Sequence, residues 1–363
     1  MDSPIHRRHF DPGSSLIDLH KALVERDSTT GSENNVTPFV TDYLRSKGFT
    51  VKVQVVQGTR ENVYAYIGPS PHARVLLTSH IDTVPPYLPY ERRGDEIWGR
   101  GSVDAKGCVA AQINAVESLL AASQISKGDV ALLYVVGEEV DNLGTRAANQ
   151  VGLSWEAVVF GEPTELKLAS GEKGEIAIRL TAHGKAGHSG YPESGESAIA
   201  MLVRALASLD CLELPWNEKY GNTTINVGTI EGGVSLCVIA ENASAGIFVR
   251  VVDHDLVGLK RQIETAVHSV APNVKIDFTT GKGPSEIDHD IAGKSFTIPL
   301  TGFETVVVNY GSDIPHLDGN HKRYLYGPGT ILVAHSDHEH LKISDMELAV
   351  EGYKVIITHL LKK

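Results

Sequence analysis

Histidines and carboxylates follow several apolar runs of this sequence, and these residue types bind divalent metal ions. The first group is Ser79-His80-Ile81-Asp82. On an extended chain His80 and Asp82 point to the same side. This spacing predicts that His80 binds a metal ion while Asp82 orients its imidazole, or that of a neighbour, and raises its basicity. A lone His-X-Asp at a strand end more often contains a structural histidine. The pair therefore has to be interpreted together with the other candidate ligands.

The loop GRGSVDAKG places Asp104 among glycines just before a predicted helix. It is not a Walker phosphate loop, because the Gly-Lys-Ser/Thr ending is absent. We expect Gly99 and Gly101 to turn the backbone so that Asp104 enters a cleft. A carboxylate there has two oxygens and can bridge two cations. A solvated turn aspartate is the alternative.

Two more apolar runs end in a glycine followed by carboxylates, at Gly137-Glu138-Glu139 and at Gly161-Glu162. Adjacent carboxylates repel each other, so Glu138 and Glu139 are hard to explain without a cation. With a cation present, one carboxylate binds it and the other serves as a general base. An exposed acidic turn remains the alternative.

The segment GPGTILVAHSDHEHL adds His335, His338 and His340, of which at least one is a candidate ligand. Together the motifs place one histidine, one bridging aspartate, two more carboxylates and a second histidine at the strand ends of one sheet. Such mixed nitrogen and oxygen ligation is typical of zinc, with cobalt or manganese as plausible substitutes.

Strands and helices alternate in the part of the chain that must position these residues. The expected strands are TVKVQVV, NVYAYIG, ARVLLTSHID, DVALLYVVGEE and AVVFGEP, with helices among them. This pattern predicts an α/β domain with a largely parallel sheet. Near Lys173 the order becomes strand, helix, two strands, helix and strand, which describes an inserted α+β sandwich. We expect the first domain over 1–173, the insertion over 174–283, and the first domain again over 284–363.

Composition narrows the class of protein. The 363 residues favour two domains, and a formal net charge of −12 argues against a nucleic-acid partner. No stretch approaches a membrane span, and the start MDSPIHRRHFDPGSS lacks the apolar core of a signal peptide. Three cysteines favour buried free thiols in the cytoplasm. Sequons at Asn35, Asn222 and Asn242 keep a secretory or vacuolar location open.

The sequence resembles the M20 metallopeptidase family, which contains acetylornithine deacetylase, succinyl-diaminopimelate desuccinylase, aminoacylase and glutamate carboxypeptidase. The matching pieces follow the family's order over nearly the whole chain; they are SHIDTVPP, GRGSVDAKG, GEEVDNLG, FGEPTE, GKAGHSGYPESGESAI, TINVGTIEGG and GPGTILVAH. The resemblance implies a zinc-exopeptidase-like catalytic domain with a mostly parallel central sheet, plus an inserted lid and dimerisation domain.

The resemblance also implies a site with two divalent metal ions, whose ligands would be His80, Asp104, Glu139, Glu162 and His335. Asp104 would bridge the ions, with His80 and Glu162 on one ion and the remaining two ligands on the other. Glu138 would be the general acid and base, and Asp82 would support the imidazole ligation. The choice of His335 over His338 rests on the spacing from the GPG motif alone.

Other matched positions concern the substrate. In the family the lid's His-Ser histidine, here His188, helps to polarise the scissile carbonyl, in dimers commonly from the partner subunit. Asn226 and Arg250 match lid positions that contact substrate, and the arginine would grip a carboxylate with two parallel hydrogen bonds. A non-catalytic histidine and a structural ion pair remain the alternatives for His188 and Arg250.

The loop containing Gly327, Gly329 and Thr330 would offer backbone donors to the same carboxylate. The chain departs from the family pattern at Cys237 and Ala240, where Asn and Pro are common. This departure weakens the inference of substrate contacts there but leaves the metal ligands untouched.

We therefore expect a metal-dependent hydrolase that cleaves the amide bond of an N-acyl amino acid or the C-terminal amide bond of a small peptide. A homodimer through the lid is expected. A non-catalytic scaffold relative is the rival from a different class, and the intact Glu138 and ligand set count against it.

Overall fold

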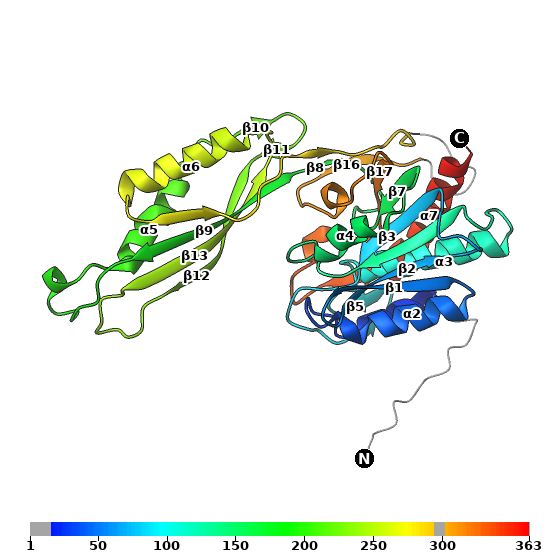
Figure 1. Ribbon diagram of the computed structural model, residues 1–363, viewed down its shortest axis with the longest axis horizontal. Helices are drawn as coiled ribbons and strands as arrows, with labels where there is room; N and C mark the ends of the chain where they lie inside the picture. The colour runs from blue at the N-terminus through cyan, green and yellow to red at the C-terminus, as the bar shows by residue number, and fades with distance from the viewer. Residues whose placement is uncertain (1–15, 294–301, 363) are drawn as a thin grey trace, which may run out of the picture. The chain divides into compact units, whose positions relative to one another are not determined.

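The computed structural model describes residues 16–293 and 302–362, so the N-terminal segment 1–15 lies outside the described residues. The chain divides into two compact units (Figure 1). Unit 1 comprises Met1–Ser170, Ile287–Val306 and Ser312–Lys363, and unit 2 comprises Gly171–Glu286 and Val307–Gly311.

The bounds of unit 2 differ from the expected insertion over 174–283 at both ends. Glu172 and Gly171 pair with Ser285 and Glu286, which extends the unit by a short stretch on each side. The N–H of Lys173 donates to the Val308 carbonyl, and Val307–Gly311, which was expected in the first domain, belongs to unit 2.

Unit 1 is built on a six-stranded sheet in the order β1-β2-β6-β3-β7-β17. The strands are β1 (Thr50–Gln57), β2 (Arg60–Tyr66), β3 (Val75–His80), β6 (Val130–Val135), β7 (Ala157–Phe160) and β17 (Lys322–Leu325). β1, β2 and β6 pair antiparallel, whereas β6, β3, β7 and β17 are parallel neighbours. The predicted α/β class with a mostly parallel sheet is confirmed.

Helices enclose this sheet: α1 (Leu16–Val24), α2 (Thr37–Ser46), α3 (Lys106–Ala121), α4 (Leu143–Ala148) and α7 (Ile343–Leu361). α3 packs against α1, α7 and β3, while α2 and α4 pack against β1 and β2. β3 and β6 are buried along their whole length, which explains why both read as continuous apolar runs.

The parallel strands bring the predicted ligands to one edge of the sheet. His80 is the last residue of β3, Gly161 follows β7 directly, and Gly137 follows β6 after a single residue. Because β6, β3 and β7 are parallel neighbours, their carboxyl ends meet at that edge. Open α/β sheets place their ligand clefts there.

Two small sheets were not expected from the sequence. One joins β18 (His340–Lys342), β5 (Glu96–Trp98) and β4 (Glu91–Arg93), and the other joins β15 (Ser285–Glu286), β8 (Leu168–Glu172) and β16 (Thr305–Val308). In the first, Trp98 pairs with His340. This register sets the loop before Asp104 beside the segment that follows His335.

Unit 2 is a four-stranded antiparallel sheet with two helices. The strands are β12 (Thr224–Gly232), β13 (Asn242–Val251), β9 (Gly174–His183) and β14 (Lys275–Phe278), and the helices are α5 (Ala198–Leu209) and α6 (Leu256–Val270). A short hairpin, β10 (Trp216–Asn217) and β11 (Gly221–Asn222), follows α5. The buried residues of β9 and β13 join both helices in a second core. Apart from this hairpin, which was not predicted, the element order is the predicted one.

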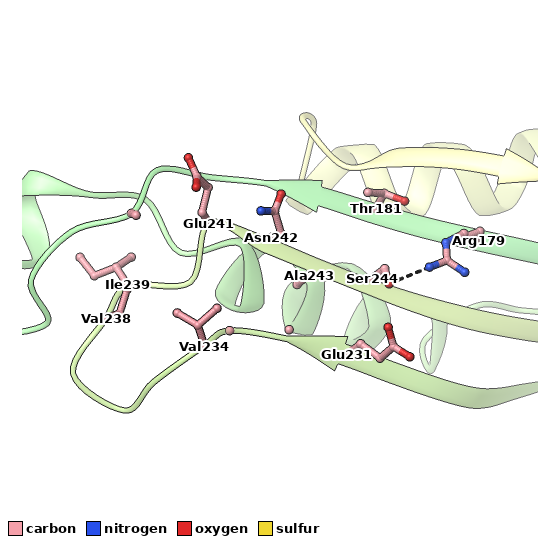
Figure 2. A pocket seen from close by; sticks show the side chains of 13 residues that line it. Arg179, Thr181, Glu231, Val234, Val238, Ile239, Glu241, Asn242, Ala243 and Ser244 are labelled. Atoms are coloured by element: carbon pink, nitrogen blue, oxygen red, sulfur yellow. Dashed lines mark hydrogen bonds between the residues drawn. The ribbon is translucent and has the colours of Figure 1, made fainter.

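A hollow of about 490 Å³ lies beside the Gly232 end of β12 (Figure 2). Val234, Val238 and Glu231 line it, and so do Arg179 and Ser244, where the guanidinium donates to the hydroxyl at 3.2 Å.

All three cysteines are described and unpaired; Cys108 is buried, whereas Cys211 and Cys237 are exposed. The expectation of buried thiols therefore holds only for Cys108. Within residues 16–293 and 302–362, no helix combines the length and apolar character needed to span a membrane.

Candidate metal centre

His80 lies at the centre of the predicted ligand group. Its Nε2 is 3.0 Å from Asp104 Oδ1 and 3.6 Å from Glu162 Oε1. Its Nδ1 lies 3.0 Å from the backbone carbonyl oxygen of Asp82. With that carbonyl accepting the Nδ1 proton, the neutral imidazole presents the Nε2 lone pair to a cation.

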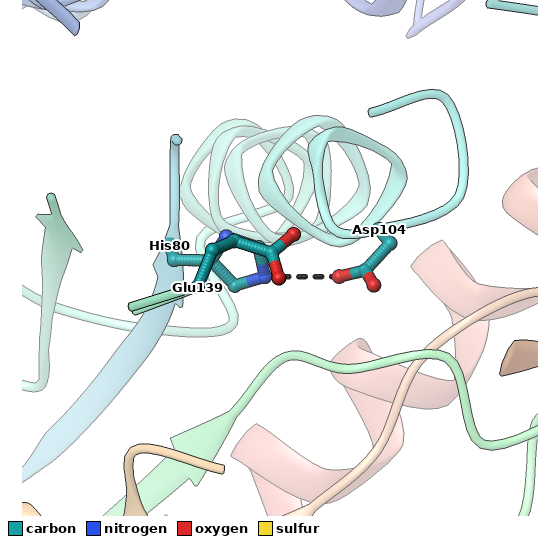
Figure 3. A group of neighbouring side chains, drawn as sticks. All are labelled: His80, Asp104 and Glu139. Carbon is teal, nitrogen blue, oxygen red and sulfur yellow. Dashed lines mark hydrogen bonds and ion pairs between the residues drawn. The ribbon is translucent and has the colours of Figure 1, made fainter. Parts of the chain in front are cut away.

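Asp104 faces a different histidine with each of its carboxylate oxygens. Oδ1 meets His80, whereas Oδ2 is 3.2 Å from His335 Nε2. His335 Nε2 is also 3.0 Å from Glu139 Oε2. Ligand atoms of His80, Asp104 and Glu139 lie within 4.8 Å of one another (Figure 3). The structure thus brings together all five predicted metal ligands.

Asp82 holds the turn that carries Glu138 and Glu139. Its carboxylate accepts the N–H groups of Glu138 at 3.1 Å and Glu139 at 3.3 Å, and the Thr30 hydroxyl at 2.8 Å. Gly137 has φ +80, and a Cβ there would lie 2.6 Å from the Arg60 guanidinium, so the turn favours glycine. The side chain of Asp82 is 3.7 Å from His80 Nδ1, so it supports that imidazole less directly than the Asp82 carbonyl does.

The carboxylates of the site are crowded and buried. Burial raises the pKa of Glu138 well above its usual value, and Glu162, Asp313 and Glu139 add to the rise. Burial likewise raises the pKa of Glu162 and of Glu139, with Asp104 contributing to both. Within the described residues, Glu139 Oε1 is buried without a hydrogen-bond partner. Divalent cations would offset this crowding.

The pKa values of the two histidines are raised as well, but here the cause is the neighbouring carboxylates and not burial. Burial alone would lower the pKa of His80, but Glu162, Asp104 and Asp82 outweigh it and raise the pKa well above the usual value. Hydrogen bonds to Asp104 and Glu139 raise the pKa of His335 to about 10. Each imidazole therefore lies in a strongly negative field, which attracts cations.

The three histidines of the C-terminal segment have different surroundings. His335 faces Asp104 and Glu139, whereas exposed His338 pairs with Asp337 at 3.1 Å. The ring of His340 stacks on Trp98 with centroids 4.7 Å apart. Neither His338 nor His340 belongs to the group around Asp104.

The loop that contains Gly327 packs against the backbone of Glu162. A Cβ on Gly327 would be 2.5 Å from the Glu162 carbonyl oxygen and 2.4 Å from Cys108 Sγ, so only glycine fits. The N–H of Gly327 already donates to the Thr164 hydroxyl at 3.0 Å. This leaves Gly329 and Thr330 as the candidate backbone donors to a substrate.

The predicted substrate residues His188, Asn226 and Arg250 belong to unit 2. His188 is exposed, and its Nδ1 accepts the Gly190 N–H at 3.1 Å, so the neutral ring carries its proton on Nε2. Asn226 is exposed on β12. The Arg250 guanidinium lies over the Phe248 ring and 3.4 Å from Glu175 Oε2, which is the ion pair kept open as its alternative role.

Sequence reasoning missed three buried charged residues near the ligands. Asp313 accepts the Asn142 side-chain amide at 3.1 Å and contributes to the raised pKa of Glu138 and Glu162. Arg100 and Glu339 form a buried ion pair. The spacing of Glu339, four residues after His335, was the available signal, but no periodic pattern distinguishes it.

Comparison with known proteins identifies the family. The model of the peptidase dimerisation domain matches residues 170–275. A peptidase M20 domain-containing protein of Schizosaccharomyces pombe is 43% identical and covers 98% of this chain and 88% of its own length. A probable carboxypeptidase of Aspergillus clavatus is 40% identical and covers 96% of this chain and 90% of its own length.

Among solved structures, a tripeptidase from Staphylococcus aureus shares the fold, with a TM-score of 0.77 and 21% identity over 96% of this chain and 98% of that one. The chain belongs to the M20 peptidase family. It is a metal-dependent hydrolase of amide bonds, as the family is. The family inferred from the motifs is confirmed.

Proposed function

We propose that this protein uses two divalent metal ions, zinc in the first instance, to cleave the C-terminal amide bond of a small peptide or the amide bond of an N-acyl amino acid. One observation carries the proposal. The two oxygens of Asp104 face two different histidines, His80 at 3.0 Å and His335 at 3.2 Å. A carboxylate in this arrangement is suited to bridge two cations.

The remaining ligands divide in the same way. Glu162 is 3.6 Å from His80, and Glu139 is 3.0 Å from His335. His80 and Glu162 would hold one ion, Glu139 and His335 the other, with Asp104 shared. When bound, the ions polarise the scissile carbonyl and make a water molecule more acidic.

Glu138 is the proposed general base and acid. Burial raises the pKa of this carboxyl, which makes it a stronger base toward the attacking water, and the proton it takes can then pass to the departing nitrogen. The hydrogen bond from its backbone N–H to Asp82 fixes the turn that aims the carboxylate. The adjacent residue Glu139 contacts His335 and is proposed as a metal ligand, not as the base.

Peptides are the favoured substrate class, because the Aspergillus clavatus relative is named a probable carboxypeptidase. Arg250, together with Gly329 and Thr330, is proposed to recognise the substrate carboxylate. This carboxylate is common to peptides and N-acyl amino acids, so these residues alone do not separate the two classes. His188, with its proton on Nε2, is proposed as a donor to the scissile carbonyl.

Metal analysis and a substrate panel test the proposal together. Purified protein is expected to contain about two divalent ions per chain, and chelation is expected to abolish hydrolysis, which zinc or cobalt restores. Cobalt-loaded enzyme is then offered dipeptides and tripeptides beside N-acyl amino acids. Protein that holds no metal and gains no activity from added zinc or cobalt would refute the proposal.

A further inference from the structure

A buried ion pair lies next to the proposed metal ligands without belonging to them. Arg100 Nη1 donates to Glu339 Oε2 at 2.5 Å, and their side chains are only 3% and 1% exposed. Burying two charges removes both from water, so such a pair is weak evidence for stability. Its contacts with the loops around it are more informative.

Glu339 fixes the loop that carries Asp104. Its Oε1 accepts the N–H groups of Val103 and Asp104, each at 3.3 Å. Its backbone carbonyl accepts the N–H of Gly99 at 3.2 Å. The residue that makes these three contacts lies four positions after His335, so one residue ties the Asp104 loop to the His335 segment.

Arg100 extends the connection to a third segment. Its Nε donates to the Pro86 carbonyl at 3.2 Å, and its backbone N–H donates to the Leu88 carbonyl at 3.1 Å. Pro86 lies in the loop that follows His80 and contains Asp82. The pair therefore joins the three segments that contribute His80, Asp104 and His335.

We propose that Arg100 and Glu339 are positioning residues that hold the Asp104 loop in the register needed to bridge two metal ions. Both oxygens of Glu339 are occupied by donors of the protein, so it acts on the metals through Asp104 and His335. The inference rests on the proposed two-metal function. Residues that orient metal ligands in this way typically change metal affinity by about 10- to 100-fold when substituted.

The test is Glu339→Gln, which keeps the size of the side chain and removes its charge. Metal-free protein is titrated with Co²⁺ and followed by calorimetry and by the visible absorption of bound cobalt. We expect cobalt affinity to fall by about 10- to 100-fold while the circular dichroism spectrum is unchanged. Of the kinetic parameters kcat is expected to fall, with KM staying within about twofold, because no substrate contact is removed.

Glu117→Gln is the matched control. Glu117 forms a part-buried pair with Lys47 at 3.1 Å, with side chains 20% and 11% exposed. It lies eleven residues after Lys106 along α3 and therefore roughly 16 Å from the start of the helix. The same chemical change there is expected to leave cobalt affinity as in the wild type.

Folded Glu339→Gln that binds cobalt with wild-type affinity overturns the inference while leaving the two-metal proposal intact. If wild-type protein binds no cobalt, the two-metal proposal fails and the inference fails with it. Should Glu339→Gln not fold, Arg100→Lys takes its place, because it keeps the charge but loses the donor to Pro86. Wild-type cobalt affinity in that variant would count against the inference equally.

Discussion

Glu138 and Glu139 are neighbours in the sequence with different surroundings in the fold. Glu139 Oε2 lies 3.0 Å from His335, whereas burial, Glu162 and Asp313 raise the pKa of Glu138. Burial raises the pKa of Glu139 as well, so it is the contact with His335, and not the pKa, that marks Glu139 as the metal ligand of the two. The two side chains are therefore suited to different tasks, and substitution can separate them.

Glu138→Gln is expected to keep the metal ions and lose turnover. The amide has nearly the same shape but cannot accept a proton, so kcat should fall by about 10²- to 10⁴-fold. Metal content by atomic emission and kcat on the same preparation check this. Exposed Glu156, paired with Arg74, supplies the control Glu156→Gln, which should keep full activity. Near-normal kcat in Glu138→Gln would remove its assigned role.

At the scale of elements, the apolar runs before His80, Glu138 and Glu162 were predictable. A strand buried on both faces needs a continuous apolar run, and β3 and β6 are buried throughout. Alternation with helices then implies parallel neighbours, whose carboxyl ends share an edge. The residues around Asp104 could therefore be predicted to lie near one another from the strand pattern alone.

The contacts of Arg100 and Glu339 that support the ligands could not be predicted from the sequence. Arg100 and Glu339 are 239 residues apart, and both lie in loops without helical or strand periodicity. The short strands β5 and β18, which bring their segments together, have only three residues each. Pairing over such distances depends on tertiary packing, so no local pattern records it.

Helix α1 contacts the loop before Asp104 through a buried histidine. The Nε2–H of His20 donates to the Ser102 carbonyl at 2.8 Å, and no described residue bonds its Nδ1. Burial lowers the pKa of His20 from 6.5 to about 4. A second proton on this ring would have no acceptor, so the folded state resists protonation that the unfolded chain accepts.

The contribution of His20 to the free energy of unfolding is therefore expected to fall as the pH drops from 6.5 toward 4, where only the unfolded chain binds a proton at His20. Above pH 6.5 the contribution is complete. The variant His20→Gln has no titrating group at this position. The difference in free energy of unfolding between the wild type and this variant should therefore shrink by up to about 3 kcal/mol as the pH falls across this range. Urea denaturation of the metal-free proteins, followed by tryptophan fluorescence, measures it. An advantage independent of pH would contradict the assignment.

At the scale of the whole molecule, unit 2 presents an apolar sheet edge. β12 pairs with β13 on one side and is the edge strand of its sheet among the described residues. Ile230, Val234 and Leu236, on or just beyond it, are exposed, and so is Val203 of α5, which contacts β12. Exposed edges invite pairing with another chain, and the dimerisation-domain match covers this region. We propose that two copies associate through this edge.

Ile230→Glu is expected to convert the dimer into a monomer. Two-fold symmetry places the substitution twice in one interface, and each copy buries an unpaired charge at a cost of about 3 kcal/mol or more. A loss of that size weakens association by more than about 100-fold, so light scattering should show the mass of one 39.1 kDa chain instead of two. Val257→Glu, at an exposed apolar position on α6, should remain dimeric. A wild-type protein that is monomeric at all concentrations would end the proposal, and a dimeric Ile230→Glu would move the interface elsewhere.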